Sequence, residues 1–154
     1  MVIYPKNSLG ARQMLSDIAE LANWVGDLVV QRRQLEKLRQ KSDRIFRYLT
    51  GKGNVRAVGA HKVRVTDAGK IKILHELVKR RKPDGQMRII IFDIPETMRS
   101  QRNAFRRHLV SLGFTMEQQS VWVSRLPCDD LVRLVVDYHG LGKFVSLIVG
   151  RLAP

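Results

Sequence analysis

The chain has 154 residues, a length that suits one domain or two small ones. Because 44% of the residues are hydrophobic, the chain can form a core, and wholesale disorder is excluded. Its formal charge of +14 indicates a polyanionic partner; nucleic acid fits better than an anionic membrane, because no basic helix carries a bulky aromatic face. The single cysteine, Cys128, excludes an intrachain disulfide, and no segment suits a bilayer span or a secretion signal. We therefore expect a cytoplasmic protein without a membrane partner.

The positive charge is concentrated in the first half of the chain. Residues 1–87 contain 19 Lys and Arg against 8 Asp and Glu, whereas residues 88–154 contain 9 against 6. Most of the excess lies in residues 31–82, which hold 17 basic and 4 acidic side chains. This distribution predicts a basic module over residues 1–82, followed by a second domain over residues 83–154.

Two helical regions are expected at the start of the chain. Asn7 or Ser8 is placed to cap the first, whose apolar residues recur at spacings of three and four. These apolar residues are Met14, Ile18, Leu21, Val25 and Leu28. The second region, residues 31–49, has a narrow apolar stripe, Leu35 and Leu38, among many basic side chains.

The second region suits a DNA groove, because Arg and Gln side chains reach base edges and phosphates. A solvated surface helix is the alternative. The candidate DNA-binding residues of this region are Arg32, Arg33, Lys37, Arg39, Lys41 and Arg44.

A hairpin and a capped helix follow the basic region. Residues 50–58 contain two glycines and are rich in turn signals. Val63 and Val65 alternate with Lys62 and Arg64, which predicts a strand with one basic, exposed face and adds Lys62 and Arg64 to the candidate DNA-binding residues. Thr66 is a natural N-cap for a helix over residues 67–79. This order of elements resembles a winged-helix DNA-binding domain, in which a helix enters the major groove and the wing strand touches the backbone.

The second half reads as strand, helix, strand, strand, helix, strand. The unbroken apolar run at residues 88–94 predicts a central strand buried on both faces. Further elements are expected at residues 97–112 (helix), 114–124 (two strands with a kink near 118–120), 127–139 (helix) and 143–152 (strand). The order is that of a ferredoxin-like fold, so the whole chain is predicted to be α+β, a winged-helix-like module before a ferredoxin-like domain.

The apolar strands of this second domain predict a partner. In a ferredoxin-like sheet both helices cover the same face, yet the strand over residues 88–94 is apolar on both. The helix-free face therefore needs a cover. We expect a homodimer through this face, because a two-fold DNA-binding protein also contacts paired half-sites. The alternative is that the N-terminal module folds back over the face.

Several short motifs in the second half resemble one family. The strings Arg-Ile-Ile-Ile-Phe-Asp-Ile-Pro-Glu at residues 88–96, Leu-Gly-Phe at 112–114, Gln-Ser-Val-Trp-Val at 119–123 and Pro-Cys at 127–128 are similar to the central domain of PaaX-like repressors. That domain is in turn similar to the small ferredoxin-like dimer of CRISPR spacer acquisition, often described as a CRISPR-associated endonuclease. The resemblance implies a transcriptional repressor. Full repressors continue into a further C-terminal domain, which we do not expect in this protein, and the CRISPR subunit has no winged helix in front.

Asp93 is the one candidate metal-binding or catalytic residue. It follows the central strand, and in the CRISPR family the matching aspartate is taken to bind Mg²⁺ with its symmetry mate across the dimer. Mg²⁺ accepts few protein oxygens, although hydrolysis also requires a positioned water and charge stabilisation. The structural alternative is that Asp93 caps the next turn or pairs with Arg99 or Arg102. The four histidines show no metal spacing.

The leading interpretation is a homodimeric regulator, repressor-like, that binds double-stranded DNA without catalysis or a cofactor. The first alternative is a CRISPR-adaptation-like subunit or a Mg²⁺-dependent endonuclease using Asp93. A toxin-like RNA nuclease of related fold is a third possibility.

Overall fold

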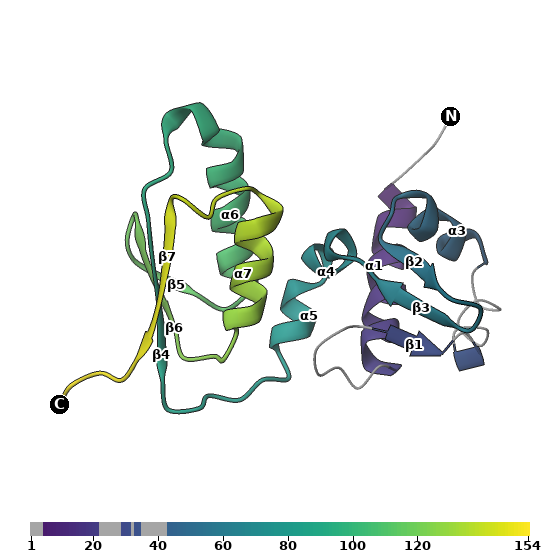
Figure 1. Cartoon of the computed structure of the whole chain (residues 1–154), viewed down its shortest axis with the longest axis horizontal. Helices are drawn as coiled ribbons and strands as arrows, with labels where there is room; N and C mark the ends of the chain where they lie inside the picture. The colour runs from purple at the N-terminus through teal and green to yellow at the C-terminus, as the bar shows by residue number, and fades with distance from the viewer. Residues whose placement is uncertain (1–4, 22–28, 32, 35–42) are drawn as a thin grey trace. The chain divides into compact units, whose positions relative to one another are not determined.

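The computed structural model describes residues 5–21, 29–31, 33–34 and 43–154. Contacts between Cα atoms divide the chain into two units, Met1–Ile73 and Leu74–Pro154. Each unit has its own antiparallel sheet and its own helices, so the chain is α+β (Figure 1). The division falls before the expected boundary at residues 82 and 83, because residues 74–78 form a helix that packs on a helix of the second unit.

The first unit contains a three-stranded sheet. Its elements are α1 (Pro5–Leu21), β1 (Val29–Gln31), α3 (Asp43–Gly51), β2 (Val55–Val58), β3 (Lys62–Val65) and α4 (Asp67–Lys72). The strands have the order β1-β3-β2, and both neighbouring pairs are antiparallel. Helices α1 and α3 contact each other.

The core of this unit follows the periodicity of the sequence. Met14 and Ile18 are buried on α1, as their spacing predicted. Val63 and Val65 point into the core while Lys62 and Arg64 lie on the other face of β3, which confirms the predicted alternation. The predicted core positions Val25 and Leu28 lie outside the described residues.

Three local predictions for this unit were wrong. Helix α1 begins at Pro5, so Asn7 and Ser8 lie inside it and do not cap it. Gln31 ends a strand instead of starting a helix, because it pairs with Lys62 across the sheet. The helix expected over residues 67–79 is broken into α4 and α5 (Leu74–Val78) at Ile73, whose φ of −124° and ψ of 26° leave the helical region.

The second unit has the strand order β5-β6-β4-β7 with every neighbouring pair antiparallel. After α5, its elements are β4 (Met87–Phe92), η1 (Glu96–Met98), α6 (Arg99–Ser111), β5 (Thr115–Gln118), β6 (Val121–Ser124), α7 (Asp129–Tyr138) and β7 (Val145–Gly150). The expected division near residues 118–120 is the turn between β5 and β6, and a separate register shift lies between Met116 and Gln118. Helices α6 and α7 lie on the same face of the sheet (Figure 1).

The core of the second unit lies between that sheet face and the two helices. Ile90 and Phe105 are completely buried, and the ring of Phe105 meets Phe92 edge-on with 5.4 Å between centroids. Gly113 ends the α6 region with a φ of +85°, a conformation that favours glycine after a helix. Cys128 is also fully buried, and burial raises the pKa of its thiol to about 11, so a structural role fits it.

Within one chain, the two faces of the sheet differ in exposure. Strand β4 is buried on its helix side only: Ile90 is inaccessible, but Ile91 is 43% exposed on the other face. Tyr138 lies on α7 and is exposed. Among the described residues, no helix is long and apolar enough to cross a bilayer.

Candidate nucleic-acid interface

The β2–β3 hairpin of the first unit presents a basic outer face. Arg56 on β2 is directly opposite Arg64 on β3, and Val58 is opposite Lys62. Residues opposite each other share a face of an antiparallel pair, so these three cations lie together, away from the buried Val63. Like charges placed directly opposite destabilise a sheet. A strand pair that keeps two opposed arginines is typical of a surface selected for binding an anion, not for stability.

Hydrogen bonds through Thr66 connect the base of this hairpin to helix α4. The Thr66 side chain accepts a hydrogen bond from the Gly69 amide at 3.3 Å and donates one to the Gly53 carbonyl. The Thr66 amide in turn donates to the Asn54 carbonyl at 2.9 Å. Thr66 therefore caps α4, as its position in the sequence predicted, and it also fixes the loop before β2.

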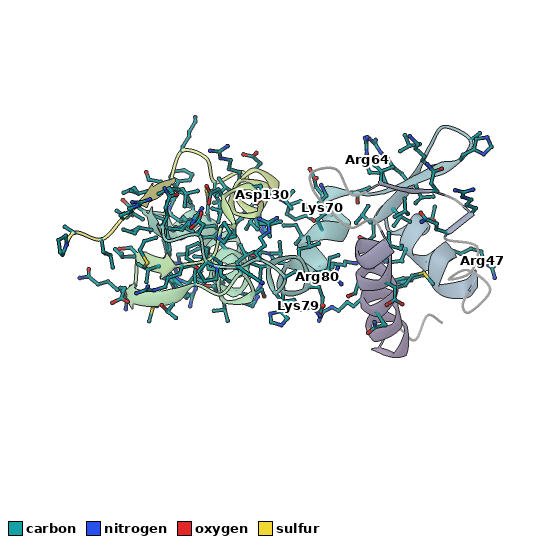
Figure 2. The ribbon with its side chains drawn as sticks, turned by 90° about the horizontal axis from the view of Figure 1, so that it is seen from below. Arg47, Arg64, Lys70, Lys79, Arg80 and Asp130 are labelled. Atoms are coloured by element: carbon teal, nitrogen blue, oxygen red, sulfur yellow. The ribbon has the colours of Figure 1, made fainter. Side chains whose placement is uncertain are left out.

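A hollow of about 480 Å³ opens beside Thr66. Arg56 and Arg64 from the hairpin and Lys70 from α4 line it, and Asp67 is the one acid among its lining residues. Figure 2 labels Arg64 and Lys70. Three cations against one acid make the hollow electropositive. Its chemistry suits a phosphate group, because guanidinium groups bind phosphate through paired hydrogen bonds.

A second group of cations surrounds Lys72 at the end of α4. Partial burial lowers the pKa of Lys72, and repulsion from Lys52 and Arg12 lowers it further. These three cations come from α1, the loop after α3, and α4, which are distant in sequence. Their mutual repulsion indicates that the fold, and not only the composition, concentrates positive charge on this unit.

The predicted DNA-binding residues are only partly described. Lys62 is exposed and Arg64 half-buried on the basic hairpin face, and Arg33 is exposed. Arg44 lies in α3. Arg32, Lys37, Arg39 and Lys41 lie outside the described residues.

Sequence reasoning missed Arg56 and Lys70. Two glycines within residues 50–58 made that stretch look like a turn, although β2 occupies residues 55–58. The strand at Arg56 could have been found by pairing residues symmetrically about the short loop 59–61, which places Val58 opposite Lys62 and Val55 opposite Val65. No local signal marks Lys70, because its place in the hollow depends on how α4 packs.

Asp93 lies at the end of β4 with its side chain exposed. Its amide donates to the Phe144 carbonyl at 2.9 Å, but its carboxylate has no hydrogen-bond or ion-pair partner among the described residues. The expected pairing with Arg99 or Arg102 was wrong: Glu96 accepts a hydrogen bond from Arg102 at 2.9 Å and lies 3.9 Å from Arg99. In the described part of the chain, no three His, Cys, Asp or Glu side chains are grouped to hold a metal. One chain therefore offers Mg²⁺ a single unengaged carboxylate here.

The other acids near the start of β4 serve the fold. Buried Arg88 is bonded to both carboxylate oxygens of Asp84 and, through Nε, to Asp129 at 2.7 Å. Arg81 pairs with Asp130 and donates to the Pro127 carbonyl at 2.8 Å. Asp130, labelled in Figure 2, and Asp129 thereby connect the first turn of α7 to the segment before β4.

The β-α-β-β-α-β order and the antiparallel pairing of the second unit define a ferredoxin-like domain. Residues 80–154 match the family described as the PaaX protein central Cas2-like domain. The resemblance to PaaX-like repressors, seen in the sequence, is thereby confirmed. No curated protein and no solved structure matches the chain.

Proposed function

We propose that the protein is a transcriptional regulator of the PaaX type that binds double-stranded DNA and acts as a repressor. The observation that carries the proposal is the basic face of the β2–β3 hairpin, where Arg56 and Arg64 lie opposite each other beside a cationic hollow. The central-domain family adds support, because its name joins this ferredoxin-like unit to PaaX proteins. In this proposal the first unit acts as a winged-helix module and the hairpin is its wing, in contact with backbone phosphates.

Homodimer formation is part of the proposal. The helix-free sheet face of the second unit is formed by Met87, Ile89 and Ile91 on β4 with apolar neighbours on β6 and β7. Ile91 and Ile148 are 43% and 47% exposed, which is unusual for large aliphatic side chains grouped on one sheet. A second copy bound over this face would bury them and would present two basic units to two half-sites.

The decisive experiment measures the affinity for duplex DNA over a range of salt concentrations. We expect the logarithm of the binding constant to fall linearly with the logarithm of salt, with a slope of about 0.9 per neutralised phosphate. Replacing both Arg56 and Arg64 with Gln should lower that slope by about two per bound unit. A matched control, Arg133→Gln with Lys143→Gln in the second unit, removes the same charge and should leave the slope unchanged. Binding that does not respond to salt would contradict the proposal.

A second candidate is a Mg²⁺-dependent nuclease or CRISPR-adaptation-like subunit. It is favoured by the unengaged Asp93 carboxylate at the end of the central strand and by the Cas2-like description of the family. If Mg²⁺ bound there, Asp93 would hold it and Mg²⁺ would supply charge stabilisation to a phosphate. The test is cleavage of DNA and RNA that requires Mg²⁺ and is lost in Asp93→Ala. Under the regulator proposal, the same variant binds DNA like the wild type.

A further inference from the structure

The cationic hollow beside Thr66, which we call the hairpin hollow, has room for a free ligand as well as for a phosphate of a DNA backbone. Its volume of about 480 Å³ lies within the range of small-molecule sites, which is about 300–1,000 Å³. One phosphate group fills only part of that space. All of its lining residues belong to the first unit, so the hollow is formed without any residue of the second.

Two arginines of the hairpin hollow lie on one face of the sheet. Arg56 and Arg64 are directly opposite across β2 and β3, a placement that puts Cβ atoms about 4.5–5.5 Å apart on the same face. Both side chains line the hollow, and Lys70 lines it from α4. Arg56 and Arg64 are therefore placed to bind the same anion, each through paired hydrogen bonds.

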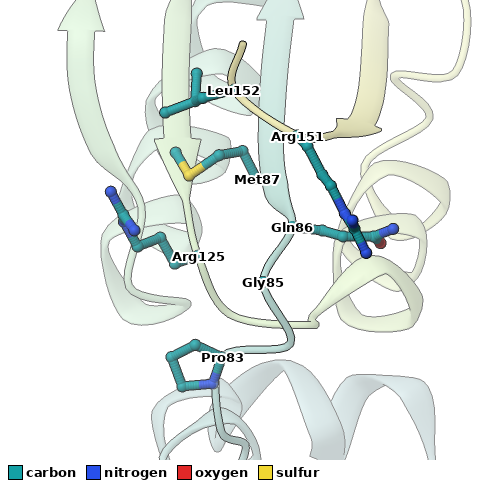
Figure 3. A pocket seen from close by; sticks show the side chains of 7 residues that line it. All are labelled: Pro83, Gly85, Gln86, Met87, Arg125, Arg151 and Leu152. Carbon is teal, nitrogen blue, oxygen red and sulfur yellow. The ribbon is translucent and has the colours of Figure 1, made fainter. Parts of the chain in front are cut away.

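The arginines at the start of β4 are arranged differently. A smaller hollow there, of about 260 Å³, is lined by Arg125 and Arg151. Arg125 lies with Met87 and Arg151 with Gln86, on opposite sides of the start of β4 (Figure 3). These two guanidinium groups do not face one anion, which distinguishes this hollow from the hairpin hollow.

The charge of the hairpin hollow favours one class of phosphate. Arg56, Arg64 and Lys70 bring three positive charges and Asp67 offsets one, which leaves two among the lining residues. A phosphodiester of a DNA backbone carries one negative charge, whereas a phosphate monoester carries about 1.5 to 2 at pH 7 and has three acceptor oxygens. A monoester therefore matches the charge of the hollow more closely than a backbone phosphate does.

Hydrogen bonds hold the walls of the hairpin hollow in place before any ligand binds. The Thr66 side chain donates to the Gly53 carbonyl and accepts from the Gly69 amide at 3.3 Å. The Thr66 amide donates to the Asn54 carbonyl at 2.9 Å. These bonds join the loop before β2, the end of β3 and the start of α4, and all three segments line the hollow. A site whose parts are already fixed loses little freedom when it binds.

We propose that the hairpin hollow binds a small phosphate monoester, with Arg56, Arg64 and Lys70 around its phosphate, and that the bound ester releases the protein from DNA. The release rests on the proposed function, which assigns the same two arginines to the DNA backbone. The ester and the duplex then compete for the hollow, so the ester weakens DNA binding. The 5′-phosphate of a DNA strand end has the same chemistry and is the alternative source of the monoester.

The first test is an amide NMR titration of the full chain with methyl phosphate and dimethyl phosphate, a monoester and a diester that differ by one charge. We expect saturable shifts at the amides of Thr66, Ala68 and Lys70, with methyl phosphate binding about fivefold tighter or more, because it carries the second charge. Asp67→Asn should tighten the binding of methyl phosphate, since it removes the one acid of the hollow.

The two arginines are tested by the double variant Arg56→Gln with Arg64→Gln. It should weaken the binding of methyl phosphate about tenfold or more, because two charged hydrogen-bond donors are lost. Its amide spectrum away from the hairpin reports that the chain is still folded. Arg133→Gln with Lys143→Gln removes the same charge from the second unit and should bind methyl phosphate like the wild type.

The second test measures DNA binding in the presence of the two esters. Methyl phosphate should weaken the binding of a duplex more than dimethyl phosphate does at the same ionic strength. Duplexes with and without 5′-phosphates separate the two sources of the monoester, and equal binding of both supports a free ester. Tighter binding of the phosphorylated duplex, lost in the double arginine variant, would overturn the free ester and assign the hollow to strand ends.

Two further results would overturn the site. The first is equal affinity for methyl phosphate and dimethyl phosphate, and the second is unchanged binding of methyl phosphate in the folded double arginine variant. Either result leaves the salt dependence of DNA binding as it was, so the proposed function would stand. DNA binding that does not respond to salt would remove the proposed function instead, and the methyl phosphate titration would remain valid evidence for the hollow.

Discussion

At the scale of single residues, Gly69 illustrates how closely the first unit is packed behind its basic hairpin. A Cβ at this position would lie 2.3 Å from the Asn54 carbonyl oxygen and 2.7 Å from a methyl of Val65. We therefore predict that Gly69→Ala lowers the free energy of unfolding by about 1–3 kcal/mol, the usual cost of overpacking. Urea unfolding followed by circular dichroism measures this change.

Gly51 provides the matched control for that substitution. A Cβ there would meet nothing within 4 Å, and Gly51 ends helix α3 without a positive φ. Gly51→Ala should be neutral or stabilise the fold by up to about 1 kcal/mol, because it reduces the freedom of the unfolded chain. Equal losses in the two variants would show that the close approach at Gly69 is not the cause.

Asp84 gives a prediction about acid stability. The hydrogen bonds from Arg88 lower the pKa of Asp84 from 3.8 to about 2 in the folded protein. A carboxyl with a lower pKa in the folded state stabilises the fold above its unfolded pKa, and that stabilisation is lost as the pH falls from about 4 to 2. We expect Asp84→Asn to flatten the pH dependence of the melting temperature in this window. Glu117→Gln, which removes an exposed acid, should keep the wild-type profile.

At the scale of elements, the contact between α6 and α7 contains a stacked histidine pair. The rings of His108 and His139 are 5.1 Å apart and inclined by 26°, and Tyr138 packs edge-on against His139. Burial lowers the pKa of both histidines. Repulsion from His139 and Arg107 lowers the pKa of His108 further, and repulsion from Arg107 lowers that of His139 further. The folded protein thus binds fewer protons than the unfolded chain near the ordinary histidine pKa of 6.5.

This histidine pair should make the second unit less stable as the pH falls below about 6.5, since unfolding then takes up protons. His139→Gln should reduce the loss of stability between pH 7 and pH 5, measured as the change in urea midpoint. His75→Gln, a substitution at an exposed histidine of α5, is the control. A wild-type midpoint that does not change across this range would contradict the prediction.

The elements also show what local sequence patterns can and cannot predict. Alternation at Val63 and Val65, the Thr66 cap and the apolar run of β4 each concern neighbours in the chain, and each prediction of element type was confirmed. The break at Ile73 and the one-sided burial of β4 depend on which unit or layer a residue packs against. Those contacts join residues distant in sequence, so periodicity does not reveal them.

The residues of the candidate site also divide into those that local sequence patterns predicted and those that they did not. Lys62 and Arg64 were predicted because they alternate with valines, whereas Arg56 was missed because glycines obscured its strand. Glu96, and not Asp93, pairs with Arg102, since the η1 turn places Glu96 beside the first turn of α6. Nothing in the spacing of these residues distinguishes the two acids.

At the scale of the whole molecule, the proposed homodimer makes its own prediction. Apolar side chains cover the middle of the helix-free sheet face, and the exposed Ile91 lies on the central strand. Ile91→Lys should prevent association, because a partner copy would bury the ammonium group without a counter-charge. Sedimentation velocity at micromolar concentration should then report a dimer for the wild type and a monomer for Ile91→Lys.

Val110→Lys is the control for this substitution, since Val110 is also exposed, at 62%, but lies on α6 and so on the helix-covered side of the sheet. It introduces the same charge and should leave the dimer intact. A dimer contacts twice as many phosphates as one chain, so the salt dependence of DNA binding should fall to about half in Ile91→Lys and stay unchanged in Val110→Lys. A wild-type monomer in sedimentation, or dissociation by both variants, would rule out the sheet face as the interface.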